Sequence, residues 1–194
     1  MLLLTAAALG LLAGLLAGGS ITNLQYVRFR WPLVLVGALL LKDAGVITPL
    51  GRLPFEHYLY LVMLVVLVFW TLWHYEQLPA IWLVSVGMAL NALVVAANGG
   101  RMPVARDLAD HGPPELLRRG ELGQYVLAGP NTRLPWLSDW IGLPGPVGHF
   151  FPQAYSPGDL VAFVGMATVV FLAVLGGSYY TSARVPARPL PHKS

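Results

Sequence analysis

The residues best placed to carry chemistry are two aspartates in the C-terminal third of the chain. Asp139 lies in the stretch LSDWI, and Asp159 ends the stretch YSPGD. Two carboxylates held close together cannot both ionise easily, so one acts as a base toward water and the other as an acid. The pair predicts an aspartyl hydrolase. The alternative is structural, because Ser156, Pro157 and Asp159 also fit the chemistry of a helix start.

A second candidate site lies inside the apolar part of the chain. Lys42 and Asp43 interrupt the apolar stretch 31–49. A helix that begins at Trp31 would place Lys42 about 16 Å along its axis, and Asn91 would lie at a similar depth in a later helix. Charges at such depth usually face a protein interior or a watery cavity. These three residues therefore predict a lipid or small-molecule site, unless Lys42 extends outward to the membrane surface.

The stretch NGGRMPV, residues 98–104, has the composition of a helix stop. It holds glycines just past the apolar run, a cation near the helix C-terminus and a proline beyond it. Asn98 and Arg101 are further candidate binding residues.

Several other kinds of chemistry are not predicted. The chain has no cysteine, which excludes disulfides and thiolate chemistry. The five histidines show no metal-ligand spacing and are expected at interfaces or in solvent. We predict no metal and no cofactor. The net charge is only +3 without a basic stripe, so nucleic acid is not an expected partner.

The elements that must position these residues are long apolar segments. The chain is 56% hydrophobic and 11% charged, against roughly 25% charged residues in a typical soluble domain. Each segment is long enough to cross a hydrocarbon core of roughly 30 Å. The sequence therefore predicts an all-α membrane protein, a five-transmembrane-helix bundle within a single domain (1–181), with helices over 2–18, 31–49, 57–73, 78–97 and 160–180.

Charged residues predict the orientation of these helices in the membrane. Basic residues near membrane segments favour the cytoplasm, and they follow the first segment (Arg28, Arg30) and occur in the tail 182–194. The N-terminus is then outside and the tail cytoplasmic, in a bacterial inner membrane. The exoplasmic loop 101–157 is expected to be partly ordered, with Trp136 and Trp140 near the outer interface and a short interfacial helix over 114–127. The first segment is expected to stay uncleaved, because its charges follow the apolar run.

The first segment also carries small residues at a helical spacing. Gly10, Gly14 and Gly18 recur every four residues, and Ala6 extends the row. Small residues allow helices to approach closely in lipid. The row predicts a packing face, either within the chain or against a partner membrane protein or a second copy.

The two aspartates resemble those of the lipoprotein signal peptidases. That family carries one Asp in a hydrophobic context and another that opens its last helix some twenty residues later, and Asn98 and Arg101 lie where it has Asn and Arg. The resemblance implies that Asp139 and Asp159 form a catalytic pair in a membrane peptidase. The family's Asn-x-Gly-Ala-Ala-Phe element is missing here, and Lys42-Asp43 inverts the order of its Asp and Lys.

A resemblance that covers nearly the whole chain rests on NGGRMPV (98–104), NTRL (131–134), Asp139 and SPGD (156–159). These stretches resemble an uncharacterised family of bacterial multi-pass proteins, the domain of unknown function 5317. The resemblance implies a bacterial inner-membrane protein and no particular activity. Three hypotheses follow: a non-catalytic scaffold or assembly subunit, an aspartyl hydrolase, and a lipid or small-molecule binding protein.

Overall fold

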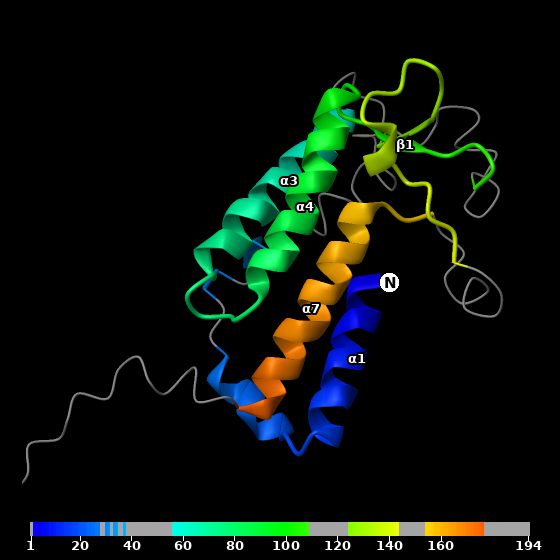
Figure 1. Cartoon of the computed structure of the whole chain (residues 1–194). Helices are drawn as coiled ribbons and strands as arrows, with labels where there is room; N and C mark the ends of the chain where they lie inside the picture. The colour runs from blue at the N-terminus through cyan, green and yellow to red at the C-terminus, as the bar shows by residue number, and fades with distance from the viewer. Residues whose placement is uncertain are drawn as a thin grey trace, which may run out of the picture.

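The structure is a computed structural model, and it describes residues 2–27, 30–31, 33–34, 37, 56–108, 124–143 and 154–176. These residues are mostly helical, as predicted. Four long helices pack side by side (Figure 1): α1 (Leu2–Leu16), α3 (Glu56–Trp73), α4 (Ile81–Ala97) and α7 (Pro157–Leu175). Most of the predicted helix 31–49, including Lys42 and Asp43, lies outside the described residues, as does the tail 182–194.

The contacts between helices define their directions. Gly10 of α1 lies against Ala167 of α7, and Gly14 lies against Val174 further along α7, so α1 and α7 run parallel. Gly87 of α4 meets the start of α7, and the earlier residue Val84 meets Gly165, so α4 runs antiparallel to α7. The helices α3 and α4 are joined by a short connection and are also antiparallel (Figure 1). We call the end that holds the start of α7 and the end of α4 the cap end, and the opposite end the basal end.

Glycines set the close approach of α7 to both of its neighbours. A Cβ atom on Gly10 would collide with the carbonyl of Ala167, and one on Gly14 would lie 2.9 Å from the side chain of Val174. On the α4 side, a Cβ on Gly165 would lie 2.7 Å from the backbone N of Val84. Such contacts gain dispersion energy from two helix backbones in close contact.

Gly18 does not belong to the packing face predicted from its spacing. The helix ends at Leu16, and Gly18 follows it in a turn with a left-handed φ of +88°, where no described residue would lie within 4 Å of a Cβ atom. Gly19 takes the next contact with α7 instead, because a Cβ there would lie 2.6 Å from the Val174 carbonyl oxygen.

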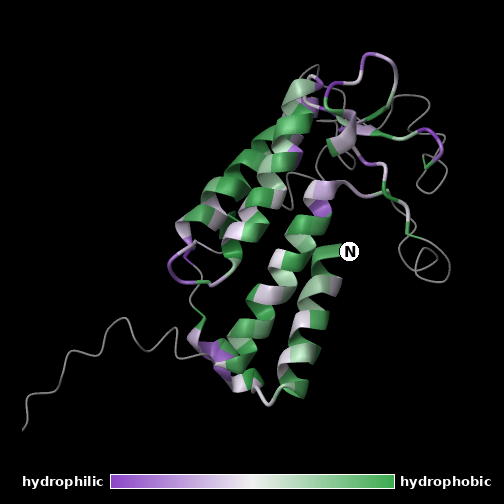
Figure 2. Cartoon of the chain, in the orientation of Figure 1, coloured by the Kyte–Doolittle hydropathy of each residue, from purple (hydrophilic) through white to green (hydrophobic). Residues whose placement is uncertain are grey.

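The outer surface of the four helices is apolar. Figure 2 shows hydrophobic colour along their length, with hydrophilic colour concentrated at the two ends. Large apolar side chains are more than one-third exposed on every one of these helices, among them Leu4, Leu12, Leu16, Val62, Phe69, Leu72, Trp82, Val86, Leu93 and Val164. A helix that is apolar all round is usually buried in protein or in lipid.

One described helix, Pro157–Leu175, is long and apolar enough to cross a membrane by length and composition. The segments Leu2–Leu16, His57–Trp73 and Ile81–Ala97 are shorter apolar helices. The predicted bundle of five spans is therefore supported here only as a mostly helical fold with one candidate span in the described part of the chain.

A small β structure covers the cap end. Strands β1 (Met102–Val104) and β2 (Tyr125–Leu127) pair in parallel, with Met102 opposite Tyr125. The chain around Asp139 pairs with the other edge of β1, and Ile141 then pairs antiparallel with Tyr155, just before α7. The predicted interfacial helix is wrong at its C-terminal end, because residues 125–127 form β2; residues 114–123 lie outside the described residues.

At the basal end, a 3-10 helix, η1 (Ile21–Tyr26), caps α7. The backbone N–H of Ser20 and the Asn23 side chain both donate to the Val174 carbonyl, at 2.9 and 2.8 Å. Gly176 then adopts a left-handed φ of +64°. The helix thus ends at Leu175, earlier than the predicted Tyr180, because Gly176 supplies a C-cap.

Candidate functional site

Asp159 lies in the first turn of α7 and closes a capping box. The Ser156 hydroxyl accepts a hydrogen bond from the backbone N–H of Asp159 at 2.9 Å. The Asp159 carboxylate accepts one in return from the backbone N–H of Ser156, at 3.1 Å through Oδ2. Pro157 occupies the first turn, where its missing N–H is not needed. The local sequence therefore folds as the helix-start chemistry predicts.

Asn91 of α4 joins this capping box to a second helix. Its Nδ2 donates to Asp159 Oδ1 at 2.7 Å, and its Oδ1 accepts from the Ser156 hydroxyl at 2.8 Å. Asn91 and Ser156 are both buried. We call these three side chains the polar cluster. Hydrogen bonds in which one partner is ionised are the stronger ones, so the Asn91–Asp159 contact is its principal link.

Gly158 makes the polar cluster possible. A Cβ atom at this position would collide with Oδ1 of Asn91 and lie 2.6 Å from the carbonyl oxygen of Gly87. A side chain there would push α7 away from α4 and separate Asn91 from Asp159. Gly158 is thus required by packing, and its role was not evident from the sequence.

Asp139 lies above the polar cluster, in the β structure of the cap. Its residue is only 5% exposed, and its backbone pairs with β1 through Pro103 and Ala105, both at 2.9 Å. Burial raises the pKa of Tyr125 well above its usual value, and the negative charges of Asp139 and then Asp159 raise it further. Asp139 and Asp159 both lie at the cap end, because Asp139 pairs with β1 and Asp159 lies in the first turn of α7.

Two more tyrosines contribute to this region, and the sequence did not mark them as site residues. Tyr60 of α3 faces Tyr125, with 6.4 Å between their ring centroids. Tyr155 is buried, and within the described part of the chain its hydroxyl has no hydrogen-bond partner. Burial, followed by the charge of Asp159, raises the pKa of Tyr155. No spacing in the sequence marks these residues, because they come from three segments far apart along the chain.

This geometry gives Asp159 a structural role. Each of its carboxylate oxygens accepts a hydrogen bond from within the protein, one from Asn91 and one from Ser156. An acid–base pair needs a carboxylate oxygen directed at a shared water or substrate. The described contacts of Asp159 fix the start of α7 to α4, and its catalytic role stays a prediction.

Of the other predicted binding residues, Asn98 also has a structural role. Its Nδ2 donates to the carbonyls of Val94 and Arg133, both at 2.8 Å, and its Oδ1 accepts from the backbone N–H of Arg133 at 2.9 Å. Asn98 therefore ends α4 and attaches the cap to it. Arg101 is partly buried just before β1.

The amide of Asn91, predicted above to form a binding site with Lys42 and Asp43, is hydrogen-bonded to Ser156 and Asp159. In the part of the chain that the structure describes, no three His, Asp or Glu side chains form a group that could hold a metal ion.

His74 is buried at the basal end, whereas histidines were expected at interfaces or in solvent. Its Nε2 lies 2.9 Å from the backbone N of Arg30, which can only donate. Its Nδ1 lies 2.7 Å from the carbonyl of Trp70, which can only accept. Both contacts form when the proton sits on Nδ1. His74 thus joins the chain at Arg30 to the end of α3.

The described residues form a helical protein with an exposed apolar surface. The polar side chains at its cap end mainly join the helices and strands to one another. The chain belongs to the Family of unknown function (DUF5317), whose model matches residues 26–171. This match confirms the family resemblance predicted from residues 98–104, 131–134 and 156–159. No curated protein and no solved structure matches the chain, so the resemblance to lipoprotein signal peptidases gains no support.

Proposed function

We propose that this protein is a multi-pass integral membrane protein of the bacterial inner membrane that acts as a non-catalytic scaffold or assembly subunit. The observation that carries the membrane assignment is the apolar exposed surface of α1, α3, α4 and α7. Monomeric soluble proteins rarely expose contiguous apolar patches larger than a few hundred Å², and larger ones mark contacts with lipid or protein. A bilayer would cover this surface on all sides of the bundle.

Helix length and direction support several crossings. The 18 residues of α3 and the 17 of α4 extend about 27 and 26 Å, close to the thickness of the hydrocarbon core. The antiparallel α3 and α4 are joined at the basal end, as consecutive spans would be. A further span over 31–49, between α1 and α3 in the sequence, would return the chain from Arg30 at the basal end to the start of α3 at the cap end.

The proposed orientation places the cap outside the cell and the basal end inside. Arg30 lies at the basal end, beside His74. The basic tail 182–194 follows α7, which also ends there. Both features agree with the preference of basic residues for the cytoplasmic side.

The polar side chains of the described part support a non-catalytic role. Asn91, Ser156 and Asp159 bind one another, and Asn98 binds the cap. The small-residue face of α1 is used by α7, while Leu4, Leu12 and Leu16 remain exposed. A partner membrane protein, or a second copy, would contact α1 through these leucines. Lipid or small-molecule binding by Lys42, Asp43 and Asn91 is less favoured, because the Asn91 amide already binds Ser156 and Asp159.

A second candidate function is an aspartyl hydrolase that uses Asp139 and Asp159. One observation favours it: Asp139 and Asp159 both lie at the cap end, where Ile141 pairs with Tyr155 just before α7. The hydrogen bonds of Asp159 to Asn91 and Ser156 favour the structural role. Hydrolysis of a membrane-anchored peptide by the purified protein, lost in both Asp139→Asn and Asp159→Asn with the fold retained, would establish the hydrolase instead.

Topology can be tested with single-cysteine variants, because the chain has no cysteine of its own. Asn131→Cys probes the exposed cap, Tyr75→Cys the exposed basal connection and Val164→Cys the exposed middle of α7. A membrane-impermeant maleimide should label Asn131→Cys in intact cells, Tyr75→Cys only after permeabilisation, and Val164→Cys in neither case. Release of the protein by alkaline carbonate, or labelling of Val164→Cys in intact cells, would contradict a membrane-spanning bundle.

The scaffold role can be tested by site-specific photo-crosslinking in the membrane. A photoreactive residue at Leu12, 54% exposed, should form a discrete product with one membrane protein or with a second copy. The same residue at Ala6, which is fully buried, should give no such product. Equal, diffuse crosslinking to lipid at every exposed position of α1 would refute a partner at this face.

A further inference from the structure

The helices α4 and α7 are staggered at the cap end. Asp159 is the third residue of α7, and it contacts Asn91, which lies seven residues before Asn98 at the end of α4. Seven helical residues correspond to about 10 Å. The start of α7 therefore lies about two helical turns below the end of α4, as Figure 1 shows.

Non-helical chain fills the space above the start of α7. The short 3-10 helix η4 (Pro135–Leu137) contacts both α4 and α7. The next residues, Ser138 to Ile141, pair with β1 and with Tyr155. Leu137 of this segment, residues 135–141, packs in one buried cluster with Val94 and Val95 near the end of α4. On α4 itself, Leu93 is 53% exposed and lies two residues past Asn91, so the apolar surface of the helix continues to this height.

Two tryptophans face outward from this segment. Leu137, Ser138 and Asp139 are at most 5% exposed, whereas Trp136 and Trp140 are 61% and 50% exposed. The buried residues fix the segment, and the two indoles project from it as a pair. Trp140 donates its indole N–H to the carbonyl of Trp136 at 3.0 Å, so the polar edge of that ring is satisfied within the protein.

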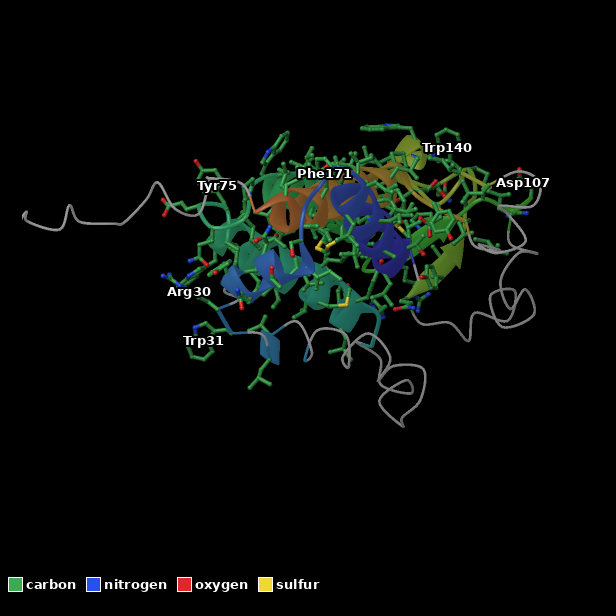
Figure 3. The ribbon with its side chains drawn as sticks, turned by 90° about the horizontal axis from the view of Figure 1, so that it is seen from below. Arg30, Trp31, Tyr75, Asp107, Trp140 and Phe171 are labelled. Atoms are coloured by element: carbon green, nitrogen blue, oxygen red, sulfur yellow. The ribbon has the colours of Figure 1, made fainter. Side chains whose placement is uncertain are left out.

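Non-helical chain at the level of a membrane needs partners for its backbone polar groups, and four N–H groups of this segment, those of Leu137, Ser138, Asp139 and Ile141, have one. The N–H groups of Leu137 and Asp139 donate to the carbonyls of Leu134 and Pro103, and Ile141 and Tyr155 exchange two hydrogen bonds. Figure 3 places Trp140 along the same side of the molecule as Phe171 of α7, opposite Trp31. Trp140 thus lies toward the cap end on the side of the molecule that carries Phe171.

We propose that residues 135–141 lie within the interfacial layer of the outer leaflet, with Trp136 and Trp140 in contact with phospholipid at the boundary between headgroups and acyl chains. Tryptophan rings concentrate at this boundary because they are amphipathic and rigid. The proposal rests on the proposed membrane function. It adds that the cap contacts lipid on the side that carries Trp136 and Trp140. A cap held above the membrane in water would leave the two indoles in solvent.

The test uses nitroxide-labelled single-cysteine variants of the full chain in liposomes of phosphatidylethanolamine and phosphatidylglycerol. Trp136→Cys and Trp140→Cys report on the proposed contact. Asn131→Cys, exposed elsewhere on the cap, is the aqueous control, and Val164→Cys is the lipid control. Collisions with oxygen, which concentrates in lipid, are compared with collisions with a water-soluble nickel chelate.

The measured quantity is the ratio of oxygen collisions to nickel-chelate collisions at each label. This ratio should be severalfold higher at residues 136 and 140 than at residue 131, and lower than at residue 164. Labels at 136 and 140 that match 131, while 164 still reports lipid, would overturn the proposal and leave the membrane function intact. A label at 164 that reports water would overturn both. A second experiment needs no label and uses lipids brominated near the headgroup, which quench tryptophan fluorescence. Trp136→Phe and Trp140→Phe should each reduce this quenching. Unchanged quenching in both variants would also contradict the proposal.

Discussion

Replacing Asn91 by alanine tests the polar cluster most directly. The change removes two hydrogen bonds, one to the Asp159 carboxylate at 2.7 Å and one from the Ser156 hydroxyl at 2.8 Å. It also leaves polar atoms of Asp159 and Ser156 without these partners at a buried contact between α4 and α7. Ser156 would keep its bond to the backbone N–H of Asp159, so the helix cap itself should persist.

The expected loss lies between two independent estimates. Interhelical hydrogen bonds in membrane proteins average about 0.6 kcal/mol each, so two give a lower value of about 1.2 kcal/mol. A bond to a charged group contributes about 1.5–3 kcal/mol and a neutral one about 0.5–1.5 kcal/mol, which gives an upper value of about 4.5 kcal/mol. We expect Asn91→Ala to lower the free energy of unfolding by about 2 kcal/mol, nearer the lower estimate, because Asp159 is only partly buried.

The measurement is equilibrium unfolding in mixed detergent micelles, followed by helical circular dichroism. Asn131→Ala is the matched control, since Asn131 is exposed on the cap. A double-mutant cycle with Asp159→Ala isolates the Asn91–Asp159 link, and the two losses should be strongly non-additive. Equal stabilities of Asn91→Ala and Asn131→Ala, or losses that simply add in the cycle, would refute the polar cluster as a link between the helices.

Three further outcomes follow from described contacts. Gly158→Ala should destabilise the protein by about 2 kcal/mol or more through overpacking. The control Gly129→Ala should change stability little, because a Cβ atom there would lie 3.9 Å from the Arg106 side chain. Equal unfolding midpoints of the two variants would contradict this prediction. Because the folded state raises the pKa of Tyr125, it favours the protonated hydroxyl, so this contribution to stability is full below about pH 10 and falls as pH rises further. Unfolding measured from pH 8 to 11 should show that fall, reduced in Tyr125→Phe, and an identical slope in both proteins would refute it. Nitrogen-15 NMR of His74 should find the proton on Nδ1, and a proton on Nε2 would contradict its contact with Arg30.

The ends of the helices were predictable where local chemistry sets them. Ser156, Pro157 and Asp159 predicted the capping box, and the glycines after Asn98 predicted the end of α4. Gly18 shows the limit of the same approach: a spacing of four residues has meaning only while the helix continues, and α1 ends at Leu16. Hydropathy alone does not locate such an end.

The contacts of the candidate site were less predictable, because they join distant segments. Counting residues gave the depth of Asn91 along its helix, but depth does not say which neighbour a helix face meets. Its partner is Asp159, 68 residues away. Similarly, β1 and β2 have three residues each, too few to show an alternating pattern, and they form only because the cap brings Met102 beside Tyr125.

The helix α7 explains why apolar and polar features of this chain occur together. It contacts α1 on one side through Ala167 and Val174 and α4 on another through Gly158 and Gly165. In lipid, apolar burial gives little preference for one such packing over another, since the acyl chains are equally apolar. Glycines allow the close approach but fix no height along the helix. The hydrogen bonds of Asp159 supply that information, because they form only when α7 begins level with Asn91. We therefore interpret Asp159 as the group that sets the stagger between α7 and α4. Residues 135–141 of the cap, which carry the two tryptophans, fill the space that this stagger leaves.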